Sequence, residues 1–396
     1  MKCLPAFITC LVVLVGCESM MNDNRLAAQR QWEHVRAQTA CDRAVDYLEI
    51  GQLDKAGGKA HESLELDEDY HPARIVLATV LIEQGRYQAA AAELEKVLRD
   101  EPDSAEARFL AAVAYEKAGD LPKALSDYRV AYELDETNFN AVLAGTEVLV
   151  AMDRTAEAAH YLSGHIYKAD NDPAAYELAG RLAMMQQAYE RAATYCRRAY
   201  ELDGENLAYL EALATAQVFA KRHADAIYSL STRLQQVEPP APTWVYTMLG
   251  DCYLAVGAHQ QACEIYRKLC ELNPDDAAHW VALAKANLAA GNLAMAINAA
   301  ERALHVDPDS VDATCLLGYA LLLSERGQEA ATVLTAAVAA HPQDVTLQCI
   351  LGRALETAGD RSGAEAAYRE AVRSEPQNAL AWALLRDASA NASALP

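Results

Sequence analysis

The chain has 396 residues and carries 56 acidic against 34 basic side chains, a formal net charge of −22. This excess of negative charge argues against nucleic acid as a partner, because phosphates are bound mainly by Lys and Arg, and against a chain that lies flat on anionic lipid. A charge of this size keeps a soluble domain dispersed and can attract a basic partner, although most of these charges are expected to lie on a solvated outer face. Apolar residues make up 52% of the sequence and include many alanines, which suits closely packed helices.

Residues 1–16 have the features of a signal peptide. Lys2 gives a positive start, and residues 4–15 are apolar apart from Thr9, a run shorter than the roughly 20 residues of a membrane span. The run ends in Leu-Val-Gly-Cys at residues 14–17, which resembles the bacterial lipobox. The resemblance implies that Cys17 becomes a lipidated N-terminus carrying acyl chains such as palmitate, so that the protein is anchored in a membrane without spanning it.

Residues 17–36 are predicted to form a short tether after the lipidated cysteine. In enterobacterial lipoproteins an Asp directly after the cysteine favours retention in the inner membrane, whereas this chain has Glu18. We therefore expect a lipid-anchored protein of the cell envelope, in the outer membrane and facing the periplasm. From Arg25 onward the chain is expected to be helical and to cap the region that begins at residue 37.

From residue 37 to residue 378 the sequence repeats with a period of 34 residues. Ten alanines mark the period, and only the interval between Ala226 and Ala262 departs from it, at 36 residues. They are Ala56, Ala90, Ala124, Ala158, Ala192, Ala226, Ala262, Ala296, Ala330 and Ala364. A fixed period of this size indicates a solenoid whose units cannot bury a core alone.

The columns of the period describe a pair of helices. When each marker alanine is numbered place 20 of its repeat, place 8 is Gly or Ala in nine of ten repeats and place 32 is Pro in five. Two small residues on either side of a turn let two antiparallel helices approach to about 8–10 Å, and Pro ends the second helix. Places 11 and 24 are mostly large and apolar or aromatic, and are expected to fill the space around the small pair.

These columns resemble those of the tetratricopeptide repeat family. In repeat 8 the family's strongest preferences are met by Trp280, Leu283, Ala284, Gly291, Ala296, Ala303 and Pro308. The resemblance implies an all-α fold, a right-handed α-solenoid of about ten helix–turn–helix repeats. Repeats 1–6 would occupy residues 37–240, repeats 7–10 residues 241–378, and a capping helix and tail residues 379–396.

Some columns break. Thr146 replaces the small residue of repeat 4, and Gln217 and Arg233 occupy apolar places of repeat 6, so repeats 4–6 are expected to pack less tightly. Residues 238–242 read Glu-Pro-Pro-Ala-Pro and contain the two-residue insertion. This segment is interpreted either as an elbow between repeats 1–6 and 7–10 or as a lengthened loop in a continuous superhelix.

The family resemblance also implies a protein-binding groove, because in that family places 2, 5, 9, 12 and 13 of the first helices point to the concave side. The groove residues predicted in this way are Phe109, Arg181, Met184, Met185, Val218, Phe219, Trp244, Lys285, Leu288, Tyr319, Leu322 and Arg353. An apolar groove with scattered charge suits an amphipathic helix or an extended peptide. The alternative is that several of these residues only pack between repeats.

The sequence offers no basis for catalysis. It contains no nucleophile elbow, P-loop, dinucleotide loop, C-x-x-C or H-E-x-x-H motif, so we expect a protein that is not an enzyme and that binds no metal and no cofactor. Seven cysteines follow Cys17, an odd number that cannot all pair within the chain. They are expected to be mainly small buried apolar residues, although a Cys252–Cys263 bridge is conceivable.

Signal, tether and repeats together predict a membrane-anchored periplasmic scaffold whose partner is a peptide segment or a folded envelope protein. Its architecture resembles that of lipoprotein pilotins, which favours assembly of an envelope complex of the pilus or secretion type. One alternative is a scaffold for exopolysaccharide export or for cell-wall enzymes. An alternative of another class is a glycan-binding or small-ligand-binding protein, although inward-facing aromatic residues are sparse.

Overall fold

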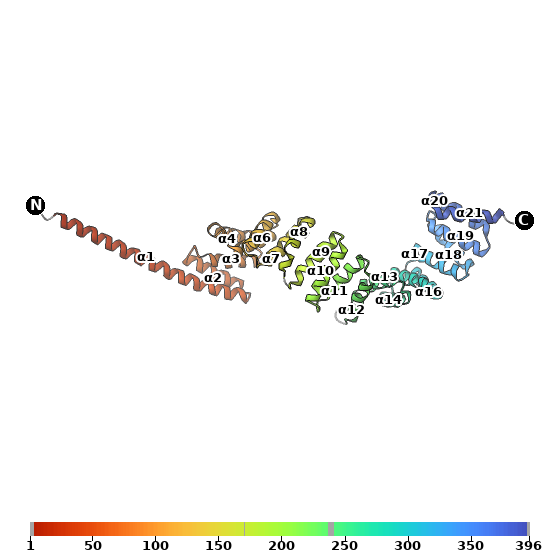
Figure 1. Ribbon diagram of the computed structural model, residues 1–396, viewed down its shortest axis with the longest axis horizontal. Coiled ribbons are helices and arrows are strands. Elements are labelled where there is room, and N and C mark those ends of the chain that lie inside the picture. The colour runs from red at the N-terminus through yellow and green to blue at the C-terminus, as the bar shows by residue number, and fades with distance from the viewer. Residues whose placement is uncertain (1–3, 170, 237–240, 394–396) are drawn as a thin grey trace. The chain divides into compact units, whose positions relative to one another are not determined.

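The structure, a computed structural model, describes residues 4–169, 171–236 and 241–393, with side chains described from Arg25 to Ser389 (Figure 1). Within these ranges the regular elements are 21 α-helices and one short 3-10 helix. The contacts divide the chain into two compact units, Met1–Gln187 and Ala188–Pro396. The predicted all-α fold of consecutive helix–turn–helix repeats is confirmed.

The first unit contains five first helices and four second helices. The first helices are α1 (Leu4–Glu49), α3 (His71–Glu83), α5 (Ala105–Ala118), α7 (Phe139–Ala151) and α9 (Pro173–Met185). The second helices are α2 (Leu53–Leu66), α4 (Tyr87–Asp100), α6 (Leu121–Leu134) and α8 (Thr155–His165), the last followed by the 3-10 helix η1 (Ile166–Lys168). Each first helix from α1 to α7 packs against the second helix that follows it.

The second unit continues the alternation and ends in an additional helix. It comprises α10 (Tyr189–Leu202), α11 (Leu207–Phe219), α12 (His223–Gln235), α13 (Thr243–Ala255), α14 (His259–Leu272), α15 (Ala277–Ala289), α16 (Leu293–Val306), α17 (Val311–Leu323), α18 (Gly327–Ala340), α19 (Val345–Ala358), α20 (Arg361–Ser374) and α21 (Ala379–Ser393). Helix α21 packs against α20 and, more weakly, α19. Apolar residues of α21 thereby cover the end of the last pair.

The turn within each repeat needs a left-handed residue at place 15. All ten residues at this place have positive φ, and six of them are glycines, which adopt this conformation without strain. The other four are Asp153, Gln187, Lys221 and Glu325, with φ between 57° and 59°. The geometry of the helix pair therefore imposes the conformation whether or not the sequence supplies glycine.

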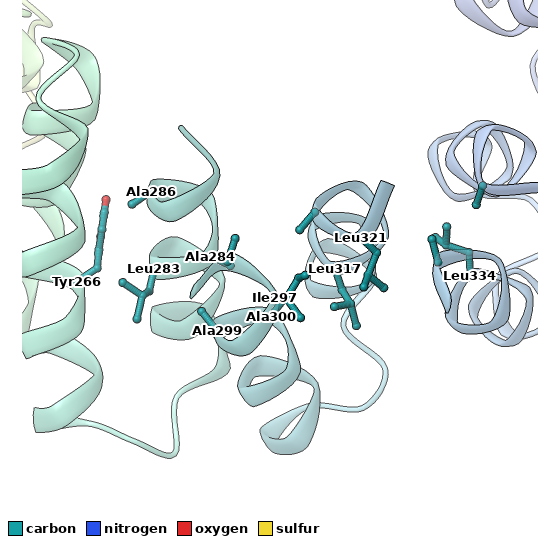
Figure 2. Packing of buried hydrophobic residues seen from close by; sticks show 14 of the residues in the cluster. Tyr266, Leu283, Ala284, Ala286, Ile297, Ala299, Ala300, Leu317, Leu321 and Leu334 are labelled. Carbon is teal, nitrogen blue, oxygen red and sulfur yellow. The ribbon is translucent and has the colours of Figure 1, made fainter. Parts of the chain in front are cut away.

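The core lies where the small places of the period meet large side chains. All ten marker alanines are at most 1% exposed, and every residue at place 8 is buried. Figure 2 shows part of the core of the second unit, from Tyr266 to Leu334. The contact is close: a Cβ added to Gly352 would lie 2.3 Å from Tyr368 Cε1, and one added to Gly318 would lie 2.8 Å from Leu334 Cδ1. Small residues at place 8 are therefore a steric requirement.

The places where the columns break are buried and internally paired. Thr146 is fully buried, and its hydroxyl donates to the Val142 carbonyl at 2.7 Å. In repeat 6 the Ser229 hydroxyl donates to Gln217 Oε1 at 2.8 Å, and the Arg233 guanidinium forms an ion pair with Glu211. These hydrogen bonds offset the desolvation of the polar groups.

The N-terminal region is helical well before the first repeat, because α1 runs without a break from Leu4 to Glu49. Of the helices in the described part of the chain, none combines the length and the apolarity that crossing a bilayer requires. The predicted lipidation site Cys17 lies outside the residues whose side chains are described. Three of the five residues of the predicted elbow, 238–240, also lie outside the described ranges, so the elbow stays a prediction.

Candidate functional site

A cavity of about 480 Å³ opens among the first helices of the first unit. We call it the N-terminal groove. It is lined by Val45, Leu48, Ile75, Val76, Thr79, Ala105, Glu106, Phe109, Leu110, Asp135 and Asn138. Most of these residues lie on α1, α3 and α5, and α3 contacts both α1 and α5 within the unit. The groove is thus a mainly apolar surface built from three successive repeats.

The period explains why these residues converge. Val45 and Thr79 both stand at place 9 of their repeats, and Ile75 and Phe109 both stand at place 5. Side chains at equivalent places of stacked helices face the same side. The residues at one place therefore form a row across successive repeats, and such rows line the groove. The ring of Phe109 is half-buried and meets Tyr128 edge to face, with ring centroids 5.5 Å apart. This contact fixes the Phe109 side chain in the groove wall.

Of the predicted groove residues, Phe109 is the one that lines this cavity. The prediction missed Val45, Leu48, Ile75 and Thr79, although they occupy the places 5, 9 and 12 that pointed to Phe109 and its equivalents. Applying the same places to repeats 1 and 2 would have found them. The signal was therefore present in the sequence.

The three other predicted residues of the first unit lie on α9. Arg181 is exposed and forms an ion pair with Glu147 of α7, with Nη2 and Oε1 3.3 Å apart. Both residues stand at place 9, so the pair shows that these side chains of successive repeats come within reach of each other. Met184 is half-buried and Met185 is 53% exposed. The cation of Arg181 is already neutralised by a neighbour on the same face.

In the second unit, half of the predicted residues belong in part to the core. Val218 and Trp244 pack against the cluster around Leu230 and Leu249, and Leu288 and Leu322 pack against the larger cluster of α14–α19. Phe219 is 49% exposed, but its ring stacks on Tyr189 with centroids 5.3 Å apart. These side chains are thus partly used in packing between the helices, and only part of their surface is open to a binding partner.

The remaining three residues are all at place 9 and all exposed. They are Lys285 on α15, Tyr319 on α17 and Arg353 on α19, and we call them the cationic row. Helix α17 contacts both α15 and α19, so the row follows three adjacent first helices. Within the described part of the chain, neither cation of the row has an acidic oxygen within 4.0 Å. The row therefore differs from the Glu147–Arg181 pair at the same place.

The described cysteine side chains are neither bridged nor activated as nucleophiles. The seven cysteines with described side chains are free thiols, and Cys252 and Cys263 are not bridged. Burial raises the pKa of Cys252 to about 11 and that of Cys270 to about 12, so both are protonated at neutral pH and are poor nucleophiles. Among the described residues, no group of three or more His, Cys, Asp or Glu side chains is placed to hold a metal ion.

Comparison with known families identifies the repeat. A family model described as tetratricopeptide repeat matches residues 75–139, 147–206 and 281–345, and two more of the same description match 243–286 and 321–388. Together they cover more than half of the chain. The chain belongs to the tetratricopeptide repeat family. Tetratricopeptide repeats form scaffolds for protein–protein interaction, so the groove and the row of this chain are candidate binding surfaces for a protein partner.

The curated relatives are much longer than this chain. A TPR repeat-containing protein of Treponema pallidum is 28% identical over 234 residues, which are 52% of this chain and 28% of the relative. Tetratricopeptide repeat protein 37 of Xenopus laevis is 25% identical over 271 residues, 67% of this chain and 15% of that protein. The chain spans less than a third of the length of these relatives. The similarity thus concerns the repeats.

Two solved structures align with parts of this chain at low sequence identity. A structure of Pseudomonas aeruginosa PilF is 17% identical with a TM-score of 0.46, over 53% of this chain and 95% of that chain. A structure of MamA is 22% identical with a TM-score of 0.39, over 42% of this chain and 96% of that chain.

Proposed function

We propose that this protein is a lipid-anchored periplasmic scaffold that binds a protein segment during assembly of an envelope complex of the pilus or secretion type. The observation that carries the proposal is the N-terminal groove, an apolar cavity formed by the first helices of three repeats. Apolar surface left open in this way is typical of interaction sites. Its walls are helices held by a buried core, so the groove is preformed and binding requires little reorganisation.

The proposed occupant is an amphipathic helix or an extended peptide. Ile75, Phe109 and Leu110 offer apolar contacts in the groove, and Glu106 and Asp135 add carboxylates to its lining. Such a pattern suits a partner that presents one apolar face and keeps polar groups toward water. We propose binding and not catalysis as the work of this site, because its lining supplies apolar contacts in place of paired nucleophiles and bases.

The envelope location is supported by the sequence of residues 1–17. A positive start, an apolar run and Leu-Val-Gly-Cys form a lipoprotein signal that would attach the chain at Cys17. Attachment to a membrane would raise the effective concentration of the groove near membrane-associated partners. Lipidation thus gives the proposed scaffold its place of action and adds no contact to the groove.

Photocrosslinking tests the groove in cells that produce the protein naturally. Phe109→p-benzoyl-phenylalanine places a reactive group in the groove, and Tyr228→p-benzoyl-phenylalanine places it on α12, where Tyr228 is 77% exposed. We expect a discrete protein adduct from position 109 and none of the same mass from position 228. The adduct should disappear when Thr79→Arg fills the groove. No adduct at 109, or the same adduct at both positions, would contradict the proposal.

Metabolic labelling tests the anchor separately. We expect the natural chain to incorporate an alkyne analogue of palmitate and to fractionate with the outer membrane, and Cys17→Ser to lose both properties. Labelling that survives Cys17→Ser would place the lipid elsewhere. An unlabelled cytosolic natural chain would contradict the envelope location while leaving the crosslinking result intact.

A further inference from the structure

We propose that the cationic row of Lys285, Tyr319 and Arg353 binds an acidic peptide segment in which two carboxylates flank one apolar residue. The inference rests on the proposed function, because it names the chemistry of the partner at a second surface of the scaffold. It concerns the first-helix face of α15, α17 and α19, within the second unit.

The spacing of the row follows from the repeat. Lys285, Tyr319 and Arg353 are separated by one period each, and the helices that carry them are in contact. Packed helices lie about 8–10 Å apart, so the two cations are separated by about 16–20 Å. An extended chain advances about 3.3 Å per residue, so carboxylates about five or six residues apart reach both cations.

The centre of the row is an exposed apolar contact. Tyr319 is 52% exposed, and Leu323, one turn further along α17, is 49% exposed. Beneath them Leu322 packs against the core of α14–α19, which holds the surface rigid. Tyr and Arg are the residue types on which interfaces concentrate binding energy, and a rigid tyrosine loses little entropy on contact. An apolar partner side chain would therefore seat between the two cations.

The charges of the row are available to a partner. In the first unit, Glu147 neutralises Arg181 at the same place of neighbouring repeats. In the second unit, two acidic residues of first helices, Asp251 on α13 and Glu356 on α19, bind tyrosines of the second helices instead. Asp251 accepts a hydrogen bond from Tyr266 at 2.5 Å, and Glu356 accepts one from Tyr368 at 3.0 Å. A partner carboxylate would give Lys285 and Arg353 the charge-assisted hydrogen bonds that the chain does not provide there.

The negative net charge of the chain favours some anionic partners over others. The net charge of −22 repels a densely charged polyanion, such as nucleic acid or an anionic membrane, more strongly than it repels a peptide that carries two carboxylates. Two isolated cations separated by an apolar contact match discrete carboxylates on one short segment. The row therefore favours an acidic peptide over a phosphate-rich surface.

The test is a selection of random peptides of about twelve residues, displayed on their encoding RNA, against the immobilised full chain. We expect the selected peptides to carry Asp or Glu at two positions about five or six residues apart, with an aliphatic or aromatic residue between them. For the best peptide, Lys285→Glu combined with Arg353→Glu should weaken the Kd by at least about tenfold. Replacing both acids of the peptide by Lys should restore binding to that double variant.

A matched control changes the net charge equally without touching the row. Lys268→Glu combined with Arg302→Glu alters two exposed cations on the second helices α14 and α16, and should leave the Kd unchanged. Thermal melts of both double variants verify that they are folded.

The proposal is overturned if the selected peptides are basic or show no charge pattern, if none is selected, or if both double variants bind alike. Peptides that are lost on Thr79→Arg but not on the row variant bind the N-terminal groove. That outcome would keep the proposed function and refute the row.

Discussion

Repeats 6 and 10, both in the second unit, share the contact between places 8 and 24 but surround it with different residue types, polar in repeat 6 and apolar in repeat 10. In repeat 10, Gly352 at place 8 lies against the fully buried ring of Tyr368. In repeat 6, Ala214 and Leu230 occupy the corresponding places and are equally buried, but Gln217, Ser229 and Arg233 lie beside them with at most 3% of their surface exposed. Polar side chains thus replace apolar ones around the contact between places 8 and 24, and that contact is kept.

The difference shows which part of the period determines the fold. The small and large residues at places 8 and 24 set how closely two helices approach, and both repeats keep them. The surrounding places tolerate polar side chains because these bind each other, as Ser229 binds Gln217 and Arg233 binds Glu211. Removing one member of such a pair should therefore be far worse than replacing both.

The largest effect is expected at the central contact of repeat 10. Gly352→Ala would put a methyl group 2.3 Å from the Tyr368 ring, and relief requires movement of the ring or of the helices. We expect a loss of about 3 kcal/mol in local stability, measured by hydrogen exchange of the α19 and α20 amides. Gly58→Ala is the control, because a Cβ there meets nothing within 4 Å and a helical alanine is more stable than glycine by about 0.5–1 kcal/mol. Equal effects of the two substitutions would contradict the steric account.

A smaller loss is expected at the ion pair of repeat 6. Glu211→Ala removes the carboxylate that pairs with the buried Arg233 guanidinium and should destabilise α11 and α12 by about 2 kcal/mol, less than for a fully buried pair because Glu211 is partly exposed. Adding Arg233→Met should recover most of this loss, since it removes the buried charge. The measurement is a double-mutant cycle in urea-induced unfolding. Additive effects of the two substitutions would show that the pair is not coupled.

Alkaline pH should destabilise repeat 7, which contains Cys252 and Cys270, more than its neighbour, repeat 6. Burial raises the pKa of Cys252 to about 11 and of Cys270 to about 12, from an ordinary value of 9.0. The unfolded thiols lose protons before the folded ones, so the stabilisation is complete below pH 9 and is lost as the pH rises through 11. By pH 10 the loss is about 1 kcal/mol per thiol.

Urea midpoints at pH 8 and pH 10 measure this loss. Comparison of the natural chain with a variant that carries Cys252→Ala and Cys270→Ala cancels the contribution of the other titrating groups. The urea midpoint of the variant should fall less between the two pH values than that of the natural chain. Parallel decreases in the two proteins would exclude the thiols as the cause.

The sequence predicted the fold through its period, and the sites only in part. The places of the small residues, the helix pairing and the exposure of Tyr319 and Met185 follow from one column rule, because stacked repeats repeat their environment. The rule could identify Gln217 as a break but not its partner Ser229, since their hydrogen bond depends on side-chain rotamers across a turn. The residues of the N-terminal groove follow from the same column rule, but its open volume depends on the separation of three helices, which no single residue encodes.

The smallest expected effect concerns the turn, where the two repeats also differ. Place 15 is Gly359 in repeat 10 but Lys221 in repeat 6, and both have positive φ, 90° and 59°. A side chain in this conformation costs about 1–2 kcal/mol, whereas glycine loses about 0.5–1 kcal/mol more entropy on folding. Lys221→Gly should therefore stabilise α11 and α12 by about 0.5 kcal/mol, and Lys221→Ala, which keeps the Cβ, should change nothing. Hydrogen exchange of these helices distinguishes the two outcomes. Destabilisation by Lys221→Gly would mean that the lysine turn is held by interactions that the glycine turns lack, and that the ten turns are not equivalent.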